Sequence, residues 1–417
     1  MFLLLFMVNN PIAAEDYSFD VSEFENKKFD MSGNLKINPI YLQNNSESDL
    51  FRAKYFNQNS EGYSDLLYVI PEFFLKFDNK KFKFNASGNF NLRHKDHEWE
   101  LDRTLYESYL EFQTGYFTHG FGKKTVKWGK GYIWNPVSFA GKQKDVDDVD
   151  AALEGFYMYN LEWVKAFNKG KIKNLALDLV LIPTSSDYNE SYGNGASMSY
   201  LTRLYALVNN TDIDLYFFYN SDEDVKVGFD FSRNLRDNWE IHFEASHENN
   251  YRQSFMDSNG KLVNDLKSNT NLLLGTRYLT QSEITIIFEY LHNAGGLTRE
   301  QMDNYYTGLK LALDSNVNVP YYKENFNSFN KQFVSRDYLY LKMTRPQPWD
   351  LLYFTPGFYM IYNLTDHSST STIEMKYTGF TEYEILGKYS IFGGGDSTQY
   401  GEKTGRKKVE LQIRYFF

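Results

Sequence analysis

Cysteine is absent from the 417 residues of the chain. This absence excludes disulfides, thiolate metal sites and cysteine nucleophiles. Long apolar runs are also missing: after the N-terminal segment no apolar run reaches about 18 residues, which excludes a helical membrane protein. Positively charged residues are fewer than negatively charged ones, and the net charge is -10. Phosphate binding needs a basic surface, so nucleic acid is not an expected partner.

Sequence motifs of catalysis are lacking as well. The chain has no Gly-x-Ser-x-Gly, no P-loop and no His-Glu-x-x-His, and its 7 histidines are scattered. Asp145, Asp147, Asp148 and Asp150 could ligate Ca²⁺, but their spacing lacks the glycine and the distal glutamate of an EF-hand. A solvated acidic loop is the favoured interpretation. The sequence therefore predicts no enzyme, no cofactor and no metal site.

Aromatic residues, by contrast, are abundant. The chain has 34 Tyr and 35 Phe, and aromatic residues make up 18% of the sequence, far more than a soluble core needs. Two aromatic girdles at membrane interfaces would use this surplus. The mean hydropathy is only -0.54. Both values fit alternating strands around a wet interior.

The N-terminal segment has the character of a targeting signal. Met1–Val8 is apolar and is followed by Pro11–Ala14, although the usual basic region is missing. We predict a signal peptide at 1–14 with cleavage after Ala14. Residues 15–28 are then a polar periplasmic lead-in, and 29–417 form the folded domain.

Apolar and polar side chains alternate through residues 408–415 near the C-terminus, and Phe417 continues the apolar parity. One parity holds Val409, Leu411, Ile413, Tyr415 and Phe417, and the other holds Lys408, Glu410, Gln412 and Arg414. Side chains alternate faces along a strand, so one face is apolar and the other charged. This ending resembles the final strand of bacterial outer-membrane β-barrel proteins. The resemblance implies that this strand closes a barrel among outer-membrane lipids, and that Tyr415 and Phe417 are an assembly signal for the barrel-insertion machinery.

The same alternation recurs along the whole chain, most clearly at 81–93. It predicts strands at 29–42, 65–78, 81–94, 103–116, 118–127, 150–166, 173–184, 195–208, 211–220, 223–234, 238–249, 269–280, 282–293, 333–345, 349–363, 366–378, 381–391 and 407–417. One alternating segment is weak evidence for a membrane-spanning strand, but the same pattern repeated along the chain is persuasive. The predicted fold is an all-β transmembrane antiparallel barrel of about 18 strands, with 16 as the main competitor. Leu50–Phe56 also alternates and is a candidate additional strand.

A soluble β-sandwich or propeller is the alternative fold. The Phe-, Trp- and Leu-rich face on strand after strand disfavours a sandwich, and no blade-like repeat is visible. Connection lengths support the barrel, since short periplasmic turns and long external loops should alternate. We predict long links at 94–102, 128–149, 185–194, 250–268, 294–332 and 392–406. In the link 294–332, Thr298 and Gln301 form a capping box, which predicts a short helix in a structural lid.

A distinctive stretch lies between residues 105 and 140. Leu105–Phe112 is rich in Glu and Tyr, and it is followed by Gly120–Val137, which contains the pair Trp128-Gly129. This order resembles porin-like barrels, namely the alginate-export porins and an uncharacterised porin-like family associated with RND-superfamily exporters. The resemblance implies passage of a solute across the outer membrane.

The lysines of this stretch are the candidate pore constriction. If the loop 120–150 folds into the lumen, Lys123, Lys124, Lys127 and Lys130 would face carboxylates, and Trp134 would be a rigid anchor. Long loops on rigid scaffolds tend to carry function. The alternative is a surface loop that two tryptophans pin in place.

Parity also predicts which charges point into the lumen. A Lys or Arg facing lipid at the midplane costs about 2–4 kcal/mol, which favours the wet side. The predicted inward set is Lys83, Arg93, Asp230, Glu240, Glu244, Arg336 and Lys342. Their mixed signs suit either a ladder of ion pairs or a field that guides polar solutes.

The sequence thus favours an outer-membrane channel for polar solutes, narrowed by the 120–150 loop. One alternative is the barrel component of lipid or hydrophobic-molecule export with an RND-type exporter. Another is a surface protein that acts through its loops and transports nothing.

Overall fold

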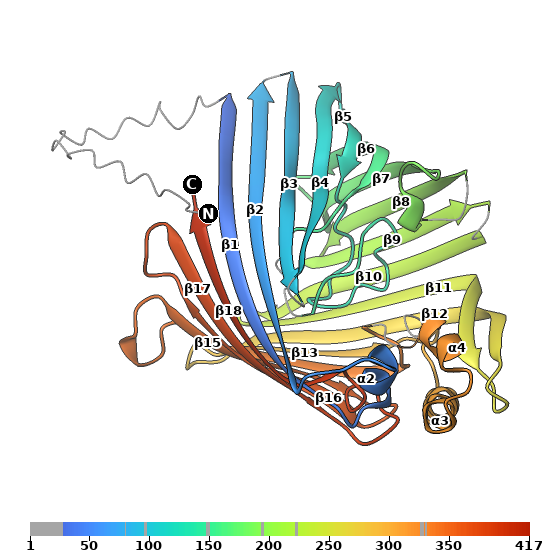
Figure 1. Ribbon diagram of the computed structural model, residues 1–417. Coiled ribbons are helices and arrows are strands. Elements are labelled where there is room, and N and C mark those ends of the chain that lie inside the picture. Colours follow the sequence, from blue (N-terminus) through green and yellow to red (C-terminus); the bar gives the residue numbers. More distant parts are fainter. Residues whose placement is uncertain are drawn as a thin grey trace.

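Eighteen strands within the described residues form one closed antiparallel sheet (Figure 1). The computed structural model describes residues 28–417 except 80, 96–97, 147–150, 193–195, 222–223, 326–328 and 330–331. Each strand pairs with its neighbours in sequence, and β1 pairs with β18 to close the barrel. The predicted fold and the count of 18 are confirmed. The predicted signal peptide at 1–14 and nearly all of the lead-in at 15–28 lie outside the described residues.

The strands are β1 (Phe29–Asn44), β2 (Tyr63–Asn79), β3 (Phe82–Lys95), β4 (Glu98–Thr114), β5 (Phe117–Lys124), β6 (Phe156–Ala166), β7 (Ile172–Thr184), β8 (Ser197–Val208), β9 (Thr211–Asn220), β10 (Asp224–Arg236), β11 (Trp239–Met256), β12 (Leu262–Leu279), β13 (Thr285–His292), β14 (Asp337–Thr344), β15 (Phe354–Asn363), β16 (Ser368–Tyr377), β17 (Tyr383–Gly393) and β18 (Gly405–Phe416). The helices are α2 (Asp49–Lys54), α3 (Arg299–Ser315) and α4 (Val319–Glu324), with 3₁₀ turns η1 (Glu190–Tyr192) and η2 (Pro348–Asp350).

The two faces of the sheet differ in chemistry. On β9, Leu215 and Phe217 are exposed on the outside, whereas Asp214 and Tyr216, which alternate with them, are buried on the inside. Other exposed apolar side chains are Phe73, Phe82, Phe90, Leu204, Leu274, Phe288, Ile373 and Leu411. An apolar exterior around a polar interior is the arrangement that spans a membrane as a barrel. In the described part of the chain, no helix is both long and apolar enough to cross a membrane.

The connections at the two ends of the barrel differ in length. β1 begins and β18 ends at the same end of the barrel, which we name the terminal end. The turns at this end are short. The opposite, helical end carries α2, α3, α4 and the long loops (Figure 1). Two predicted long links were wrong: 94–102 and 250–268 are mostly strand, because β3 and β4, and likewise β11 and β12, extend beyond the other strands.

The segment predicted as an additional strand, Leu50–Phe56, forms helix α2 instead. Ser48 caps the helix by accepting a hydrogen bond from the backbone of Phe51. Leu50 and Ala53 both pack into a cluster with α3 and α4. Their spacing of three residues is that of one face of a helix, and the alternation of apolar residues did not distinguish this helix from a strand.

The helix predicted from Thr298 and Gln301 is confirmed as α3. The Thr298 hydroxyl accepts from the Gln301 backbone, and the Gln301 side chain accepts from the Thr298 backbone. The helix is longer than expected, because its buried face packs continuously against α2, α4 and the end of β11. The buried side chains of this helical cluster are Leu50, Ala53, Met256, Leu297, Met302, Tyr305, Tyr306, Leu309, Ala312, Leu313, Val319, Tyr322, Phe329 and Val334.

The C-terminal residue takes part in closing the barrel. Gly33 and Phe417 exchange two backbone hydrogen bonds of 2.9 and 3.0 Å. The Phe417 ring covers Gly33 so closely that a Cβ there would lie 2.6 Å from ring carbons. An aromatic ring over a strand glycine protects that position from the surroundings.

We therefore expect Tyr415→Ser with Phe417→Ser to impair membrane insertion while leaving secretion intact, because the last strand must pair with the first. Heat-modifiable migration on gels is the measurement. Phe380→Ser, which removes an exposed aromatic side chain from a turn at the same end, is the control. Normal migration of the double variant would contradict an assembly role for these two residues.

Candidate functional site

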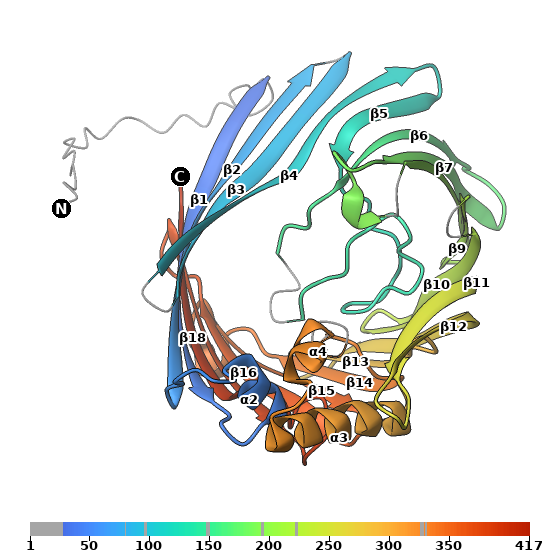
Figure 2. The same ribbon diagram turned by 45° about the vertical axis from the view of Figure 1, so that its right-hand side comes forward.

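The connection between β5 and β6 lies inside the barrel (Figure 2). We name residues 125–155 the inner loop; four of them, 147–150, including the predicted acidic residues Asp147, Asp148 and Asp150, lie outside the described residues. The inner loop contacts side chains of strands from β6 to β14, most of which are far from it in sequence. These contacts fix its path across the interior.

Glu244 on β11 is the first anchor of the inner loop. Its carboxylate has no exposed surface. One oxygen accepts from the backbone of Lys130 and Gly131 at 2.6 and 2.7 Å. Asn135 and the Val137 backbone also donate to this carboxylate. A buried carboxylate needs such donors, so a tight turn of the loop is folded around it.

Glu289 on β13 is the second anchor. It accepts hydrogen bonds from the backbone of Tyr132 and Ile133, and its partner on the wall is His242 Nε2 at 3.1 Å. The Tyr132 hydroxyl donates to Glu240 at 3.1 Å. Burial raises the pKa of Tyr132 to about 12, so its hydroxyl keeps the proton that it donates throughout the physiological range.

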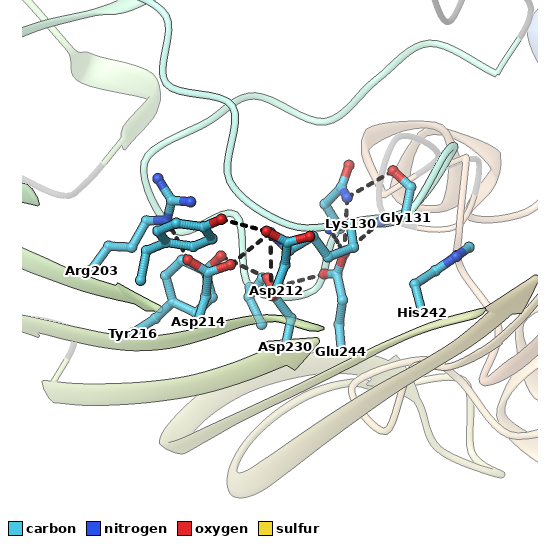
Figure 3. Close-up of polar contacts among 12 residues, drawn as sticks. Lys130, Gly131, Arg203, Asp212, Asp214, Tyr216, Asp230, His242 and Glu244 are labelled. Carbon is cyan, nitrogen blue, oxygen red and sulfur yellow. Dashed lines mark hydrogen bonds and ion pairs between the residues drawn. The ribbon is translucent and has the colours of Figure 1, made fainter. Parts of the chain in front are cut away.

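Lys130 connects the inner loop to a row of charges on the wall (Figure 3). Its ammonium lies 2.7 Å from Asp214 on β9 and 3.9 Å from Asp230 on β10. Arg203 on β8 donates to the other oxygen of Asp214 at 2.8 Å, and Tyr216 donates to Asp230 at 2.6 Å. Both aspartates have no exposed surface, so the two cations offset charges that would otherwise be buried unpaired.

Two tryptophans hold the inner loop by apolar packing. Trp128 packs among side chains of β6 to β9, including Tyr216 at a ring distance of 5.5 Å. Trp134 packs among Leu273, Tyr338 and Tyr340 on β12 and β14. The two tryptophans therefore attach the loop to two different parts of the wall, Trp128 to β6 to β9 and Trp134 to β12 to β14.

Glycines permit the tight turn between these anchors. Gly129 has a φ of +98°, which side-chain-bearing residues rarely adopt. At Gly131 a Cβ would lie 1.9 Å from the Trp134 carbonyl oxygen. The close approach of the backbone to Glu244 therefore depends on the absence of side chains at both positions.

The predicted constriction lysines lie in three different environments. Lys123 donates to Glu154 and Lys124 donates to Glu111, both at 2.5 Å. Lys130 is held on the wall, as described above. Lys127 has an exposed side chain and lines a cavity beside the loop. The four lysines therefore do not form one ring, and Lys127 is the one that presents its charge to open space.

The predicted inward charges mostly make contacts on the inner face. Their partners are Asp78 for Lys83, Glu100 for Arg93, Lys130 for Asp230, Tyr132 for Glu240, the inner-loop backbone for Glu244, the Gly296 carbonyl for Arg336 and Glu374 for Lys342. Arg336 lies just before β14 rather than on it. Most of these residues thus join local ion pairs, as a structural ladder would.

Open space lies beside the inner loop on two sides. One cavity of about 520 Å³ is lined by Lys127, Lys142 and Trp134, among others. A second, of about 530 Å³, is lined by Tyr132 and Lys342, among others. Lys144 borders both cavities and donates to the carbonyl groups of residues 131 and 132. A polar solute on either side of the loop would therefore meet lysine ammonium groups.

Two anchors escaped the sequence prediction. Glu289 and Asp214 share the parity of inward residues on their strands, but each lies more than 80 positions from the loop residue that it contacts. An isolated carboxylate on an otherwise apolar strand such as Thr285–His292 was the available signal, because such a group needs a partner inside the fold.

Comparisons with known proteins were made by sequence and by structure. No protein-family model matches the chain, and no curated protein matches it by sequence. OccK5 (OpdH) of Pseudomonas aeruginosa is similar in structure, with 10% identity, a TM-score of 0.54, and coverage of 93% of this chain and 98% of that chain. OprD of the same organism has 11% identity and a TM-score of 0.49, covering 93% and 95%.

An engineered porin of Rh. blastica has 9% identity and a TM-score of 0.46, covering 93% of this chain and 100% of that chain. At such identities the similarity to OccK5 concerns the fold alone. Together with the closed sheet, its apolar exterior and its polar interior, this similarity shows that the chain has the fold of a porin-like transmembrane β-barrel.

Proposed function

We propose that the protein is an outer-membrane channel for polar solutes, narrowed by the inner loop. The observation that carries this proposal is the attachment of a long loop to the inner wall by two fully buried carboxylates, Glu244 and Glu289. A loop that only decorated the surface would not need anchors at this depth. In this proposal the helical end faces outward and the terminal end faces the periplasm, as is usual for outer-membrane barrels.

The walls beside the inner loop support passage of polar rather than apolar molecules. Lys127 is exposed there, and Lys142 and Lys144 lie on the same cavity. Fixed charge at a narrow point governs ion preference, because field lines are focused where water is scarce. We therefore propose that Lys127 contributes most to selectivity, whereas Lys123, Lys124 and Lys130 mainly hold structure through their carboxylate partners.

Two other functions remain alternatives to this proposal. The resemblance of residues 105–140 to alginate-export porins and to the RND-associated porin-like family favours export, with lipid or hydrophobic molecules as cargo. A surface protein that acts through the helical end would use α3 and α4 instead of the lumen. Purified protein that conducts ions in a planar bilayer would support the channel, and a silent barrel would favour the alternatives.

Deletion of residues 138–148 should raise single-channel conductance, because it removes the part of the inner loop between Val137 and the return to β6. Val137 remains on Glu244 and Trp134 stays in its apolar site, so these two attachments of the loop persist, although the deletion removes Phe139 and Ala140 from the apolar cluster against β6 to β9. Deletion of a loop at the helical end but outside the lumen, residues 258–260, is the matched control and should leave conductance unchanged. Unaltered conductance in the 138–148 deletion would show that the pore is narrowed elsewhere.

A further inference from the structure

One stretch of the barrel wall has a strand edge without a neighbouring strand. On the way from the helical end, β4 begins to pair with β5 only at Ser108, because β5 ends at Lys124 and the chain then enters the lumen as the inner loop (Figure 2). Just before Ser108, the Tyr106 carbonyl accepts from the backbone of Gly155. Within the described residues, 98–105 of β4 pair with β3 on one side and with no strand on the other. We name residues 98–105 the free edge.

The pairing with β3 determines which backbone groups of the free edge point to the open side. The Thr104 carbonyl oxygen would lie 2.8 Å from a Cβ on Gly88 of β3, so Thr104 turns its backbone groups toward β3. The backbone groups of successive strand residues point alternately to the two sides of the strand. The N–H and C=O groups of Trp99, Leu101 and Arg103 therefore point to the open side, where another strand could bond to them.

The free edge lacks several features that usually prevent a strand edge from pairing. Proline, lysine, a bulge and a covering helix have this effect. Residues 98–105 contain neither proline nor lysine, and their pairing with β3 is regular as far as Leu105 opposite Gly88, where a bulge begins. The tip of the other long hairpin, β11–β12, is covered, since Met256 there is buried in the helical cluster. Side-chain charge thus protects the free edge, and charge repels some partners while it attracts others.

The two faces of the free edge differ in chemistry. The outer face carries exposed side chains that are apolar except for one cation, namely Trp99, Leu101, Arg103 and Leu105. The inner face carries exposed carboxylates, namely those of Glu98, Glu100 and Asp102. Glu100 pairs with Arg93 on β3, whereas Asp102 lies opposite the neutral Asn91. The open backbone groups therefore lie between a mainly apolar face and an acidic face.

This chemistry disfavours two of the occupants that could cover the free edge. The hydrocarbon chains of lipid offer no hydrogen bonds to open backbone groups. Antiparallel pairing with β4 of a second copy would place carboxylates opposite carboxylates, which is destabilising, and it would point the two barrels in opposite directions across the membrane. A strand with basic side chains on one face and apolar side chains on the other matches the free edge on both faces.

We propose that the free edge is a docking site for an extended segment of another protein in which basic and apolar residues alternate. The segment adds an antiparallel strand beside β4. Its apolar side chains continue the outer face next to Leu101, and its basic side chains meet the carboxylates of the inner face, Asp102 among them. The site goes beyond the proposed channel function, and its tests do not require that the barrel conduct.

A capped, fluorescently labelled peptide of alternating lysine and valine tests this site on the purified, refolded protein in detergent micelles. Fluorescence anisotropy should show saturable binding to the protein and none to empty micelles. The same peptide with N-methylated valines keeps its charge but cannot pair antiparallel with β4, so it should bind at least about tenfold more weakly. Equal binding of the two peptides would show only attraction to a protein of net charge -10. That result, or no saturable binding of either peptide, would overturn the proposal.

Residue-resolved amide hydrogen exchange locates the bound peptide. Saturating peptide should slow exchange about tenfold or more at Trp99, Leu101 and Arg103, whose N–H groups point to the open side. Exchange at Glu100 and Asp102 should change much less, because their N–H groups already bond to β3. Uniform slowing along β4, or slowing confined to other strands, would contradict docking at the free edge.

Leu101→Pro tests the backbone of the free edge. It removes an N–H from the open side and none from the ladder with β3, so it should weaken binding of the lysine–valine peptide about five- to tenfold. Leu101→Val keeps the N–H and an apolar side chain, and as the matched control it should bind the peptide like the parent. Heat-modifiable migration shows that each variant is folded. Folded Leu101→Pro protein that binds as tightly as the parent would overturn the proposal.

A second pair of variants tests the acidic face without altering the backbone. Glu98→Gln with Asp102→Asn should weaken binding of the same peptide about three- to tenfold at low salt. Asp265→Asn with Glu283→Gln removes the same charge from exposed positions on β12 and in the turn after it, and it should leave binding unchanged. Equal weakening in both double variants would mean that the peptide responds to total charge and would count against the free edge as its site.

Discussion

Glu244→Gln combined with Glu289→Gln should widen the proposed channel, so that its mean single-channel conductance rises and its current fluctuates more. The two carboxylates together accept hydrogen bonds from the backbone of Lys130, Gly131 and Tyr132, among others. A hydrogen bond to a charged group contributes about 1.5–3 kcal/mol, so neutral amides would weaken several bonds at once. Amides also offer only one acceptor oxygen each, and their NH₂ groups would oppose the backbone donors.

Single-channel recording measures this effect as higher mean conductance and added fluctuation. Glu240→Gln is the matched control, because within the described part of the inner loop Glu240 accepts from the Tyr132 hydroxyl and from no backbone N–H, and a neutral acceptor serves there equally well. The barrel itself should remain folded, as judged by heat-modifiable migration, since none of these carboxylates is needed for strand pairing. A double variant that conducts as quietly as the parent would show that the two tryptophans and the ion pair of Lys130 with Asp214 suffice to hold the loop.

Lys127→Glu should shift the ion selectivity of the channel toward cations. Lys127 is the predicted constriction lysine whose charge is exposed on the cavity beside the inner loop, and the substitution changes the local charge by two units. Lys127→Gln should give an intermediate selectivity, because it removes one unit only. Reversal potentials in a salt gradient are the measurement.

Lys130→Glu is unsuitable for the same purpose. The introduced carboxylate would face Asp214 and Asp230, which are both fully buried. The expected result is therefore detachment of the loop from the wall, and not a change in ion selectivity alone. Lys124→Gln combined with Glu111→Gln, which removes both charges of one ion pair, is a better control for Lys127→Glu and should leave the reversal potential nearly unchanged. Equal shifts in this double variant and in Lys127→Glu would mean that the charge of Lys127 does not set the selectivity.

The barrel was largely predictable because its determinants are local. Alternation along each strand needs only the strand itself, and Thr298 with Gln301 marks α3 within four residues. The errors were local ambiguities: Leu50–Phe56 has apolar residues that suit both a strand and a helix, and the cap at Ser48 decides for the helix.

The site was less predictable because its contacts join distant parts of the chain. Glu244 was predicted to face the lumen, but its role became visible only when the inner loop was seen folded around it.

The most direct test of the central claim is the current through the unaltered protein, purified, refolded and inserted into a planar bilayer. A channel narrowed by a firmly anchored loop should give discrete, stable conductance steps with a moderate ion preference set by Lys127. A correctly folded barrel that carries no current would contradict the proposed function.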